Sequence, residues 1–162
     1  MTQEIIGSID GKRLRIGIAI ARFNGTVTRR LLKGALNGLR VHNMLDENIS
    51  IVWVPGSLEL AIVVREMALS GEYDGLIALG CVIRGDTTHY DVVVEQSSSA
   101  LGNIPLETGI PVVMGVLTVE NLQQALSRSG DDRSNKGYYC SETVLEMANL
   151  MKDFKAGRSR KC

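Results

Sequence analysis

The feature that most constrains the fold of this chain is a repeated alternation between short aliphatic runs and segments with helical periodicity. Residues 14–21 (LRIGIAIA) form the first run, which is rich in isoleucine and bounded by turn-forming residues. Such a run is typical of a buried β-strand. In the next segment apolar residues recur every four positions, at Val27, Leu31, Ala35 and Leu39. This spacing predicts an amphipathic helix.

The same alternation continues to the end of the chain. Strands are expected over residues 14–21, 49–54, 75–83 and 111–117. Helices are expected over residues 27–39, 58–69, 90–103, 120–129 and 138–154. Pro105 predicts that the third helix ends before it, because proline within a helix removes a backbone hydrogen bond.

Near-continuous apolar strands separated by helices predict a parallel sheet covered on both faces. With right-handed crossovers this gives a three-layer α/β fold, a flavodoxin-like doubly wound sheet of four parallel strands. Residues 3–9 (QEIIGSI) also look strand-like. We expect this strand to add to a neighbouring subunit, since a free apolar edge promotes aggregation. An ordinary frayed terminus is the alternative. We expect one domain, 1–162, with an N-terminal arm over about 1–10 and a basic tail over about 156–162.

Composition excludes several classes of protein. Lys plus Arg and Asp plus Glu both number 18, so there is no net charge to attract nucleic acid or an anionic membrane. No apolar run approaches the ~20 residues of a membrane span, and the start lacks the profile of a signal peptide. We therefore expect a cytoplasmic protein. Cys81, Cys140 and Cys162 show no CxxC spacing, which favours core residues over a disulfide framework or a zinc site.

Ligands of doubly wound sheets bind at the carboxyl ends of the strands, which directs attention to residues 22–26, 55–59, 84–91 and 118–121. In the first loop, Phe23 could stack on a flat ring or pack on its own helix, while Asn24 and Thr26 suit helix caps. In the second, Gly56 would let a ligand approach the free N–H groups of a helix start. Glu59 could bind a polyol or simply favour the helix dipole.

The third loop, RGDTTHYD, is the most polar of the four. Amides of such a glycine-containing turn can cradle a phosphate, and His89 could transfer protons near neutral pH. A purely structural role for His89 fits equally well. The carboxylate of Asp86 would repel a phosphate unless it points away. Arg128 and Lys136 could each hold a phosphate, although cations near helix ends are also common for dipole reasons.

Five segments together resemble the lumazine synthase family. They are RFN (22–24), WVPGSLE (53–59), LGCVIRGDTTHY (79–90), GVLT (115–118) and NKG (135–137), in the family's order and spacing across residues 13–155. The VIRGxTxH stretch is the most specific. The resemblance implies condensation of 5-amino-6-(D-ribitylamino)uracil with 3,4-dihydroxy-2-butanone 4-phosphate to 6,7-dimethyl-8-ribityllumazine, with release of phosphate and water. It implies no metal and no organic cofactor.

The resemblance also implies roles for individual residues. Phe23 would stack on the pyrimidine, the backbone at Ser57 and Leu58 with Glu59 would hold the ribityl chain, and His89 would shuttle protons. Amides at Asp86 and Thr87, with Arg128, would bind the phosphate. The catalytic residues are thus His89 and Arg128; the expected substrate-binding set is Phe23, Asn24, Gly56, Ser57, Leu58, Glu59, Cys81, Val82, Ile83, Asp86, Thr87, Met114 and Lys136.

The chain departs from the family pattern at a few positions. Met114, expected in a loop, and Leu58 stand where phenylalanine is frequent, and Asp86 where a small or neutral residue is usual. Family members form pentamers with shared active sites, and some assemble twelve pentamers into a shell. The resemblance therefore implies a homo-oligomer in which the arm pairs with the next subunit and Arg128 serves the neighbour's site. The only other partners it implies are the small-molecule substrates.

Two other functions remain open. A riboflavin synthase built on this scaffold would dismutate two lumazines, but lumazine carries no phosphate for Arg128 to bind. A lumazine- or flavin-binding or shell-forming protein without catalysis is the second alternative, which Met114 and Asp86 keep open.

Overall fold

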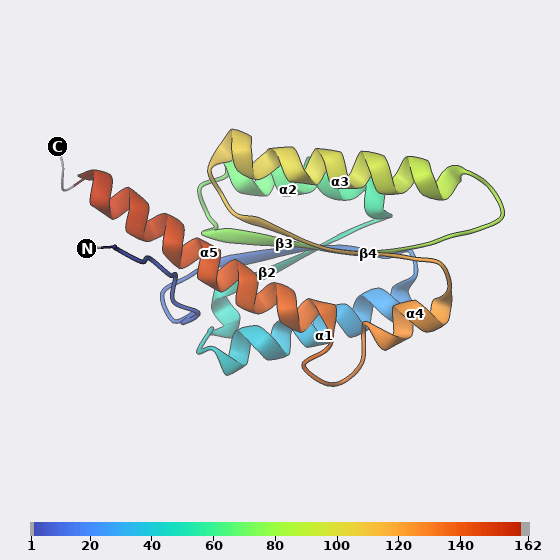
Figure 1. The fold of residues 1–162 in the computed structure, drawn as a ribbon, viewed down its shortest axis with the longest axis horizontal. Coiled ribbons are helices and arrows are strands. Elements are labelled where there is room, and N and C mark those ends of the chain that lie inside the picture. The colour runs from blue at the N-terminus through green and yellow to red at the C-terminus, as the bar shows by residue number, and fades with distance from the viewer. Residues whose placement is uncertain (1, 160–162) are drawn as a thin grey trace.

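A four-stranded parallel sheet forms the centre of the computed structural model, which describes residues 2–159 (Figure 1). Its strands lie in the order β2-β1-β3-β4. Their bounds are Ile16–Ala21 for β1, Ile49–Val54 for β2, Gly75–Ile83 for β3 and Val112–Val119 for β4. Ile18 of β1 pairs with Ile51 on one side and Ile77 on the other, so β1 and β3 are central and β2 and β4 are edges. The predicted parallel, doubly wound sheet is confirmed.

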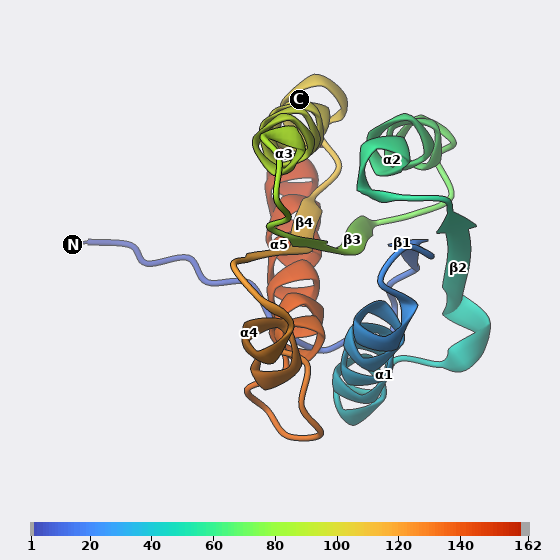
Figure 2. The ribbon, with the colours of Figure 1, turned by 90° about the vertical axis from the view of Figure 1, so that its right-hand side faces the viewer.

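Helices cover both faces of this sheet (Figure 2). One face carries α1 (Gly25–Val41), α4 (Leu122–Ser127) and α5 (Lys136–Ser159), and the other carries α2 (Leu60–Leu69) and α3 (His89–Thr108). Single 3₁₀ turns precede β2 and α2, at Asp46–Asn48 and Ser57–Glu59. The expected three-layer α/β architecture is therefore present.

Two hydrophobic cores follow from the two-residue period of the strands. Ile18 and Ile20 of β1 point into the core shared with α1 and α5, whereas Ala19 and Ala21 point toward α2 and α3. All four side chains are at most 1% exposed. Both faces of β1 are thus buried, which explains why its sequence is continuously apolar and does not alternate.

Helices α1 and α5 approach each other closely at a glycine. A Cβ added to Gly137 would lie 1.9 Å from the carbonyl oxygen of Leu31, closer than any real contact. The side chain of Asn135 lies beside this crossing and donates to the carbonyls of Arg30 and Gly130, at 3.0 and 2.8 Å. This packing places the start of α5 against α1.

The prediction that the third helix ends before Pro105 is wrong. Helix α3 continues to Thr108 with Pro105 inside its last turns. Leu101 and Ile104 are 2% and 3% exposed in the core under this helix, and that burial outweighs one missing hydrogen bond. The Thr108 hydroxyl donates to the Ile104 carbonyl at 2.8 Å, and Gly109, at φ 71°, ends the helix by donating to Pro105.

Other element bounds differ at their ends. The 3₁₀ turn replaces the first residues of the helix expected from residue 58, α4 is shorter than expected, and α5 is longer at both ends. Because α5 runs to Ser159, it includes part of the segment expected to be a basic tail, and residues 160–162 lie outside the described residues. Strand β4 begins after Pro111 and continues two residues beyond Leu117.

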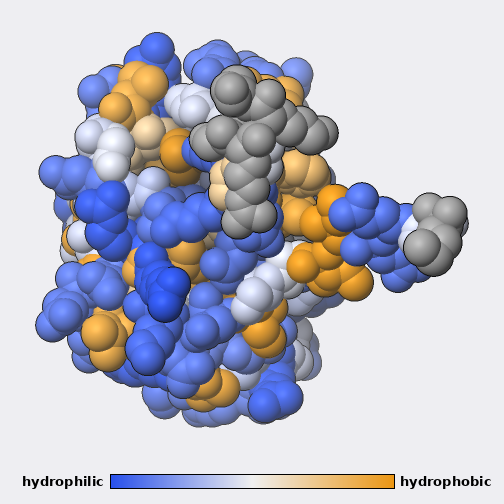
Figure 3. Space-filling model, turned by 90° about the vertical axis from the view of Figure 1, so that its left-hand side faces the viewer, coloured by the Kyte–Doolittle hydropathy of each residue, from blue (hydrophilic) through white to orange (hydrophobic). Residues whose placement is uncertain are grey.

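Residues 3–9 form no strand within the described chain. The C-terminal end of this arm is attached to α5, where the Asn149 side chain donates to the carbonyls of Ser8 and Asp10 at 2.7 and 3.0 Å. Ile5 and Ile6 are 51% and 76% exposed, and Figure 3 shows hydrophobic surface on the projecting arm. The arm therefore offers apolar surface that its own chain does not cover, and its pairing with a neighbour stays a prediction.

The cysteines and the helices bear on two further expectations. Cys81 and Cys140 are buried and free, as expected for core residues, whereas Cys162 lies outside the described residues. None of the helices in residues 2–159 is both long enough and apolar enough to cross a membrane.

Candidate active site

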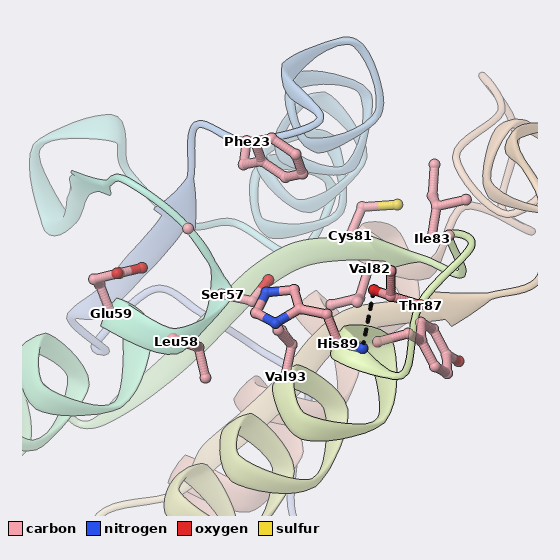
Figure 4. A pocket seen from close by; sticks show the side chains of 13 residues that line it. Phe23, Ser57, Leu58, Glu59, Cys81, Val82, Ile83, Thr87, His89 and Val93 are labelled. Atoms are coloured by element: carbon pink, nitrogen blue, oxygen red, sulfur yellow. Dashed lines mark hydrogen bonds between the residues drawn. The ribbon is translucent and has the colours of Figure 1, made fainter.

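A hollow of about 400 Å³ lies where the loops after β1, β2 and β3 meet (Figure 4). Its size is that of a pocket for a small organic molecule. It occurs at the carboxyl ends of the strands, as the topology predicts. The lining residues are Phe23, Gly56, Ser57, Leu58, Glu59, Cys81, Val82, Ile83, Gly85, Thr87, His89, Tyr90 and Val93.

The loop after β1 presents Phe23 to this hollow. Backbone hydrogen bonds from Arg22 to Val54 and from Phe23 to Pro55, at 2.8 and 3.0 Å, extend the β1–β2 ladder into the loop. Asn24 then turns the chain with φ 56°, a left-handed conformation that asparagine tolerates better than most residues. Phe23 is left 71% exposed. The alternative in which its side chain packs on its own helix is therefore wrong.

Asn24 has a different role from the expected side-chain cap. It occupies the N-cap position of α1, but its side chain makes no capping hydrogen bond. The amide nitrogen Nδ2 instead donates to the carbonyl of Cys81 on β3, at 2.8 Å. This bond ties the loop that carries Phe23 to the strand that forms the base of the pocket. Asn24 therefore supports the pocket from behind and does not line it.

The loop after β2 brings backbone and a carboxylate to the pocket. Ser57 is 8% exposed and packs over β3, where a Cβ at Gly80 would lie 2.7 Å from its hydroxyl oxygen. A glycine in β3 is thus what lets this loop approach the sheet. Leu58 and Glu59 remain accessible at the rim. Together they offer an apolar surface and hydrogen-bond acceptors close to each other.

The loop after β3 carries Thr87 and His89. The Thr87 hydroxyl oxygen accepts a hydrogen bond from the main-chain N–H of His89, at 3.4 Å. Figure 4 draws the imidazole projecting from the start of α3 toward the group formed by Ser57, Val82 and Val93. His89 is exposed, so its ring reaches both solvent and the hollow. It is the only histidine among the lining residues, and histidine is the side chain that most often serves as a general acid or base.

The cysteine in the lining is not a nucleophile. Burial raises the pKa of the Cys81 thiol from 9.0 to about 11, and its side chain is only 2% exposed. The thiol therefore stays protonated at neutral pH, and a protonated thiol is a poor nucleophile. Burial likewise raises the pKa of Cys140 to about 11, although nearby Lys136 opposes the shift.

Five of the expected site residues do not line the hollow of their own chain: Asn24, which lies behind it, and Asp86, Met114, Arg128 and Lys136. Met114 lies in β4 and pairs with Ala78, as the strand expected over 111–117 implies, so the loop position taken from the resemblance is wrong. Arg128 follows α4 and is exposed, with Nη1 donating to the Gln124 carbonyl at 3.4 Å. Lys136 is the first residue of α5, its ammonium 4.3 Å from the centre of the Tyr139 ring.

Three lining residues were missing from the expected set. Gly85 and Tyr90 stand next to residues that were assigned, inside the same polar segment. Val93 lies one helical turn after His89, so the periodicity of α3 places both on the same face. A helical projection starting at His89 would have found Val93.

No group of three His, Cys, Asp or Glu side chains within residues 2–159 is arranged to hold a metal ion. What the hollow contains is an exposed aromatic ring, backbone and carboxylate groups at the start of α2, and a histidine at the start of α3. This combination can bind a flat heterocycle with a polar chain and move protons on it.

Comparison with known protein families identifies a match over most of the chain. The model of the family described as 6,7-dimethyl-8-ribityllumazine synthase matches residues 13–152. The match includes all five segments on which the resemblance was based, and every residue that lines the hollow.

Proposed function

The chain belongs to the 6,7-dimethyl-8-ribityllumazine synthase family of riboflavin biosynthesis, and we propose that it catalyses the reaction for which that family is named. In this reaction 5-amino-6-(D-ribitylamino)uracil condenses with 3,4-dihydroxy-2-butanone 4-phosphate. The products are 6,7-dimethyl-8-ribityllumazine, inorganic phosphate and two molecules of water. The enzyme is accordingly a transferase that needs no cofactor.

This proposal rests on one observation: the same hollow is lined by Phe23, the Gly56–Glu59 segment and His89. An exposed aromatic face suits a pyrimidine ring, since rings prefer offset stacking. Accessible backbone and the Glu59 carboxylate suit the hydroxyl groups of a ribityl chain. A histidine beside them suits a reaction whose steps are mostly proton transfers.

His89 would act at three stages of the reaction. The aromatic amine first attacks the ketone, and the departing water needs a proton. Elimination of phosphate then needs a base to remove a proton from carbon, and ring closure with loss of the second water needs another proton transfer. One imidazole that alternates between its forms can serve each stage. Holding both substrates in one hollow supplies the rest of the acceleration expected here.

We further propose that the functional unit is a homo-oligomer, a pentamer or twelve pentamers. In this arrangement Met114, Arg128 and Lys136 complete the site of a neighbouring subunit. The proposal is supported by the position of these residues away from their own hollow, and by the exposed apolar arm. It is also supported by the edge strand β2, whose outer side pairs with no other strand among residues 2–159 and could accept one from a neighbour.

The first test mixes purified protein with both substrates and follows lumazine formation by absorbance. We expect formation well above the uncatalysed rate, and His89→Ala should lower kcat about 10–100-fold, near the low end for general acid–base catalysis because water reaches this exposed position. The matched control is His42→Asn, because His42 lies at the end of α1 and contacts Glu142 at 3.1 Å, away from the hollow. Folded, assembled protein without acceleration would refute the proposed activity.

The same assay separates the alternatives. Riboflavin formed from lumazine alone would identify a riboflavin synthase and overturn the proposal. Tight binding of lumazine or riboflavin without turnover of the two substrates would identify a binding or shell protein.

Sharing of sites between subunits has its own test. His89→Ala and Arg128→Ala are unfolded together and reassembled, and activity is compared with that of each variant alone. If neighbours share sites, mixed assemblies contain some sites with both native residues, and activity rises above that of either parent. Activity that stays at the mean of the parents would contradict shared sites.

A further inference from the structure

Arg84 connects three segments at the carboxyl edge of the sheet. It directly follows β3, and its main-chain N–H donates to the carbonyl of Val119 at the end of β4, at 2.9 Å. Its Nε donates to Glu120 Oε2 at 2.8 Å, and its Nη1 lies 3.4 Å from Asp91 Oδ1. The guanidinium carbon lies 4.2 Å from the centre of the Tyr90 ring. One side chain thus joins β3, β4 and the first turn of α3.

These contacts fix both ends of the short loop between Arg84 and α3. The loop and the first residue of α3 supply Gly85, Thr87 and His89 to the hollow. Within the described residues, Gly85 and Asp86 make no hydrogen bond of their own. The loop therefore has little internal structure to hold it, and its shape depends on how its ends are anchored.

The anchor on the β4 side is itself held in place. The main-chain N–H of Glu120 donates to Gln124 Oε1 at 2.8 Å, and Asn121 caps α4 by accepting from the Gln124 N–H at 2.9 Å. Glu120 is thus part of an ordered helix start and not a free surface carboxylate. The hydrogen bond to Glu120 also raises the pKa of the Arg84 guanidinium above its ordinary value.

We propose that Arg84 is a positioning residue that holds the 85–88 loop and His89 in the arrangement that receives the phosphate-bearing substrate. This inference rests on the proposed function. Arg84 does not bind the phosphate itself, because Glu120 and Asp91 already surround its charge with two carboxylates. Its contribution is to order the loop before the substrate arrives, so that binding does not have to order it.

The geometry needs arginine and not merely a cation. The planar guanidinium donates through Nε and Nη1 to two carboxylates while its carbon lies over the Tyr90 ring. A lysine ammonium is a point charge without such a face. Arg84→Lys therefore keeps the charge and loses the anchor, which distinguishes positioning from direct attraction of an anion.

The experiment measures steady-state kinetics of the assembled protein for Arg84→Gln, Arg84→Lys and Glu120→Gln. We expect both Arg84 variants to raise KM for the butanone phosphate about tenfold, with KM for the pyrimidine changed less than about twofold. Glu120→Gln should shift KM in the same direction by less. The matched control is Arg65→Gln on α2, which removes an exposed arginine that also contacts two carboxylates, Glu66 and Glu107.

Hydrogen–deuterium exchange gives a readout that needs no turnover. Arg84→Gln should speed exchange of the hydrogen-bonded amides of His89 and Asp91 at least about tenfold and leave the remaining sheet unchanged. Unchanged exchange there would refute the anchor, and Arg84→Lys with wild-type KM would show direct attraction of the anion. Equal rises in both KM values would also overturn the inference. Wild-type protein that turns over neither substrate would refute the proposed function and with it this role, even if exchange quickens as expected.

Discussion

Replacement of Phe23 by alanine tests the proposed stacking surface most directly. A phenylalanine side chain buries about 150–250 Å² when covered, and Phe23 is 71% exposed. A ring stacked on one face would cover about half of that exposed area, on the order of 70 Å², worth about 2 kcal/mol. The aromatic pair adds about 1 kcal/mol. Phe23→Ala should therefore weaken binding by about 3 kcal/mol, or about 100-fold in Kd.

The assay is a fluorescence titration of each variant with 6,7-dimethyl-8-ribityllumazine. Phe23→Leu retains most of the apolar area without the aromatic ring and should weaken binding about fivefold to tenfold. The chain offers a matched control in Phe154→Ala, because Phe154 is the other phenylalanine, is 46% exposed and lies near the end of α5. Because Phe23 is mostly exposed, the free energy of unfolding of the Phe23→Ala variant should differ from that of the wild type by less than about 0.5 kcal/mol. A Kd for Phe23→Ala within threefold of wild type would show that no ring stacks there.

Two further predictions concern packing and thiol reactivity. Gly137→Ala should lower the free energy of unfolding, measured by urea denaturation, by about 2–3 kcal/mol, because its Cβ would collide with the Leu31 carbonyl. Gly102 on α3 has open space around it, so Gly102→Ala should raise the free energy of unfolding by about 0.5–1 kcal/mol. Equal effects of the two would contradict the α1–α5 packing. Cys81 should react slowly with iodoacetamide at pH 8, since a pKa of about 11 instead of 9.0 makes its thiolate fraction about 100-fold smaller. Its rate, followed by peptide mapping, should rise with pH toward 11; rapid reaction at pH 8 would show that the thiol is not buried.

The strands could be predicted closely because their signal is local. Aliphatic runs bounded by turn residues give the observed ends of β2 and β3, whereas β1 begins at Ile16 instead of residue 14 and β4 covers Val112–Val119 instead of 111–117. The end of α3 could not be predicted this way. It depends on burial of Leu101 and Ile104 against residues distant in the sequence, which no local rule for proline includes.

Prediction of the site succeeded and failed for a similar reason. Phe23, Glu59 and His89 follow strands whose carboxyl ends meet at one edge, so the topology alone brings them together. Met114, Arg128 and Lys136 were assigned from the resemblance, and the fold of a single chain does not carry them to the same hollow. The anchoring role of Arg84 could not be predicted from the sequence, because its partners Asp91 and Glu120 lie 7 and 36 positions away.

The bond from Asn24 to the Cys81 carbonyl spans 57 positions of sequence, and the hollow exists only where β1, β2 and β3 have already assembled. A molecule that fits the hollow is therefore a ligand of the native state and not of the unfolded chain. By mass action, such a ligand at about 100 times its Kd adds about 2.7 kcal/mol to the free energy of unfolding. In a cell, the supply of substrate would then reduce the small fraction of the chain that is unfolded and exposed to proteases, as well as govern how fast product forms.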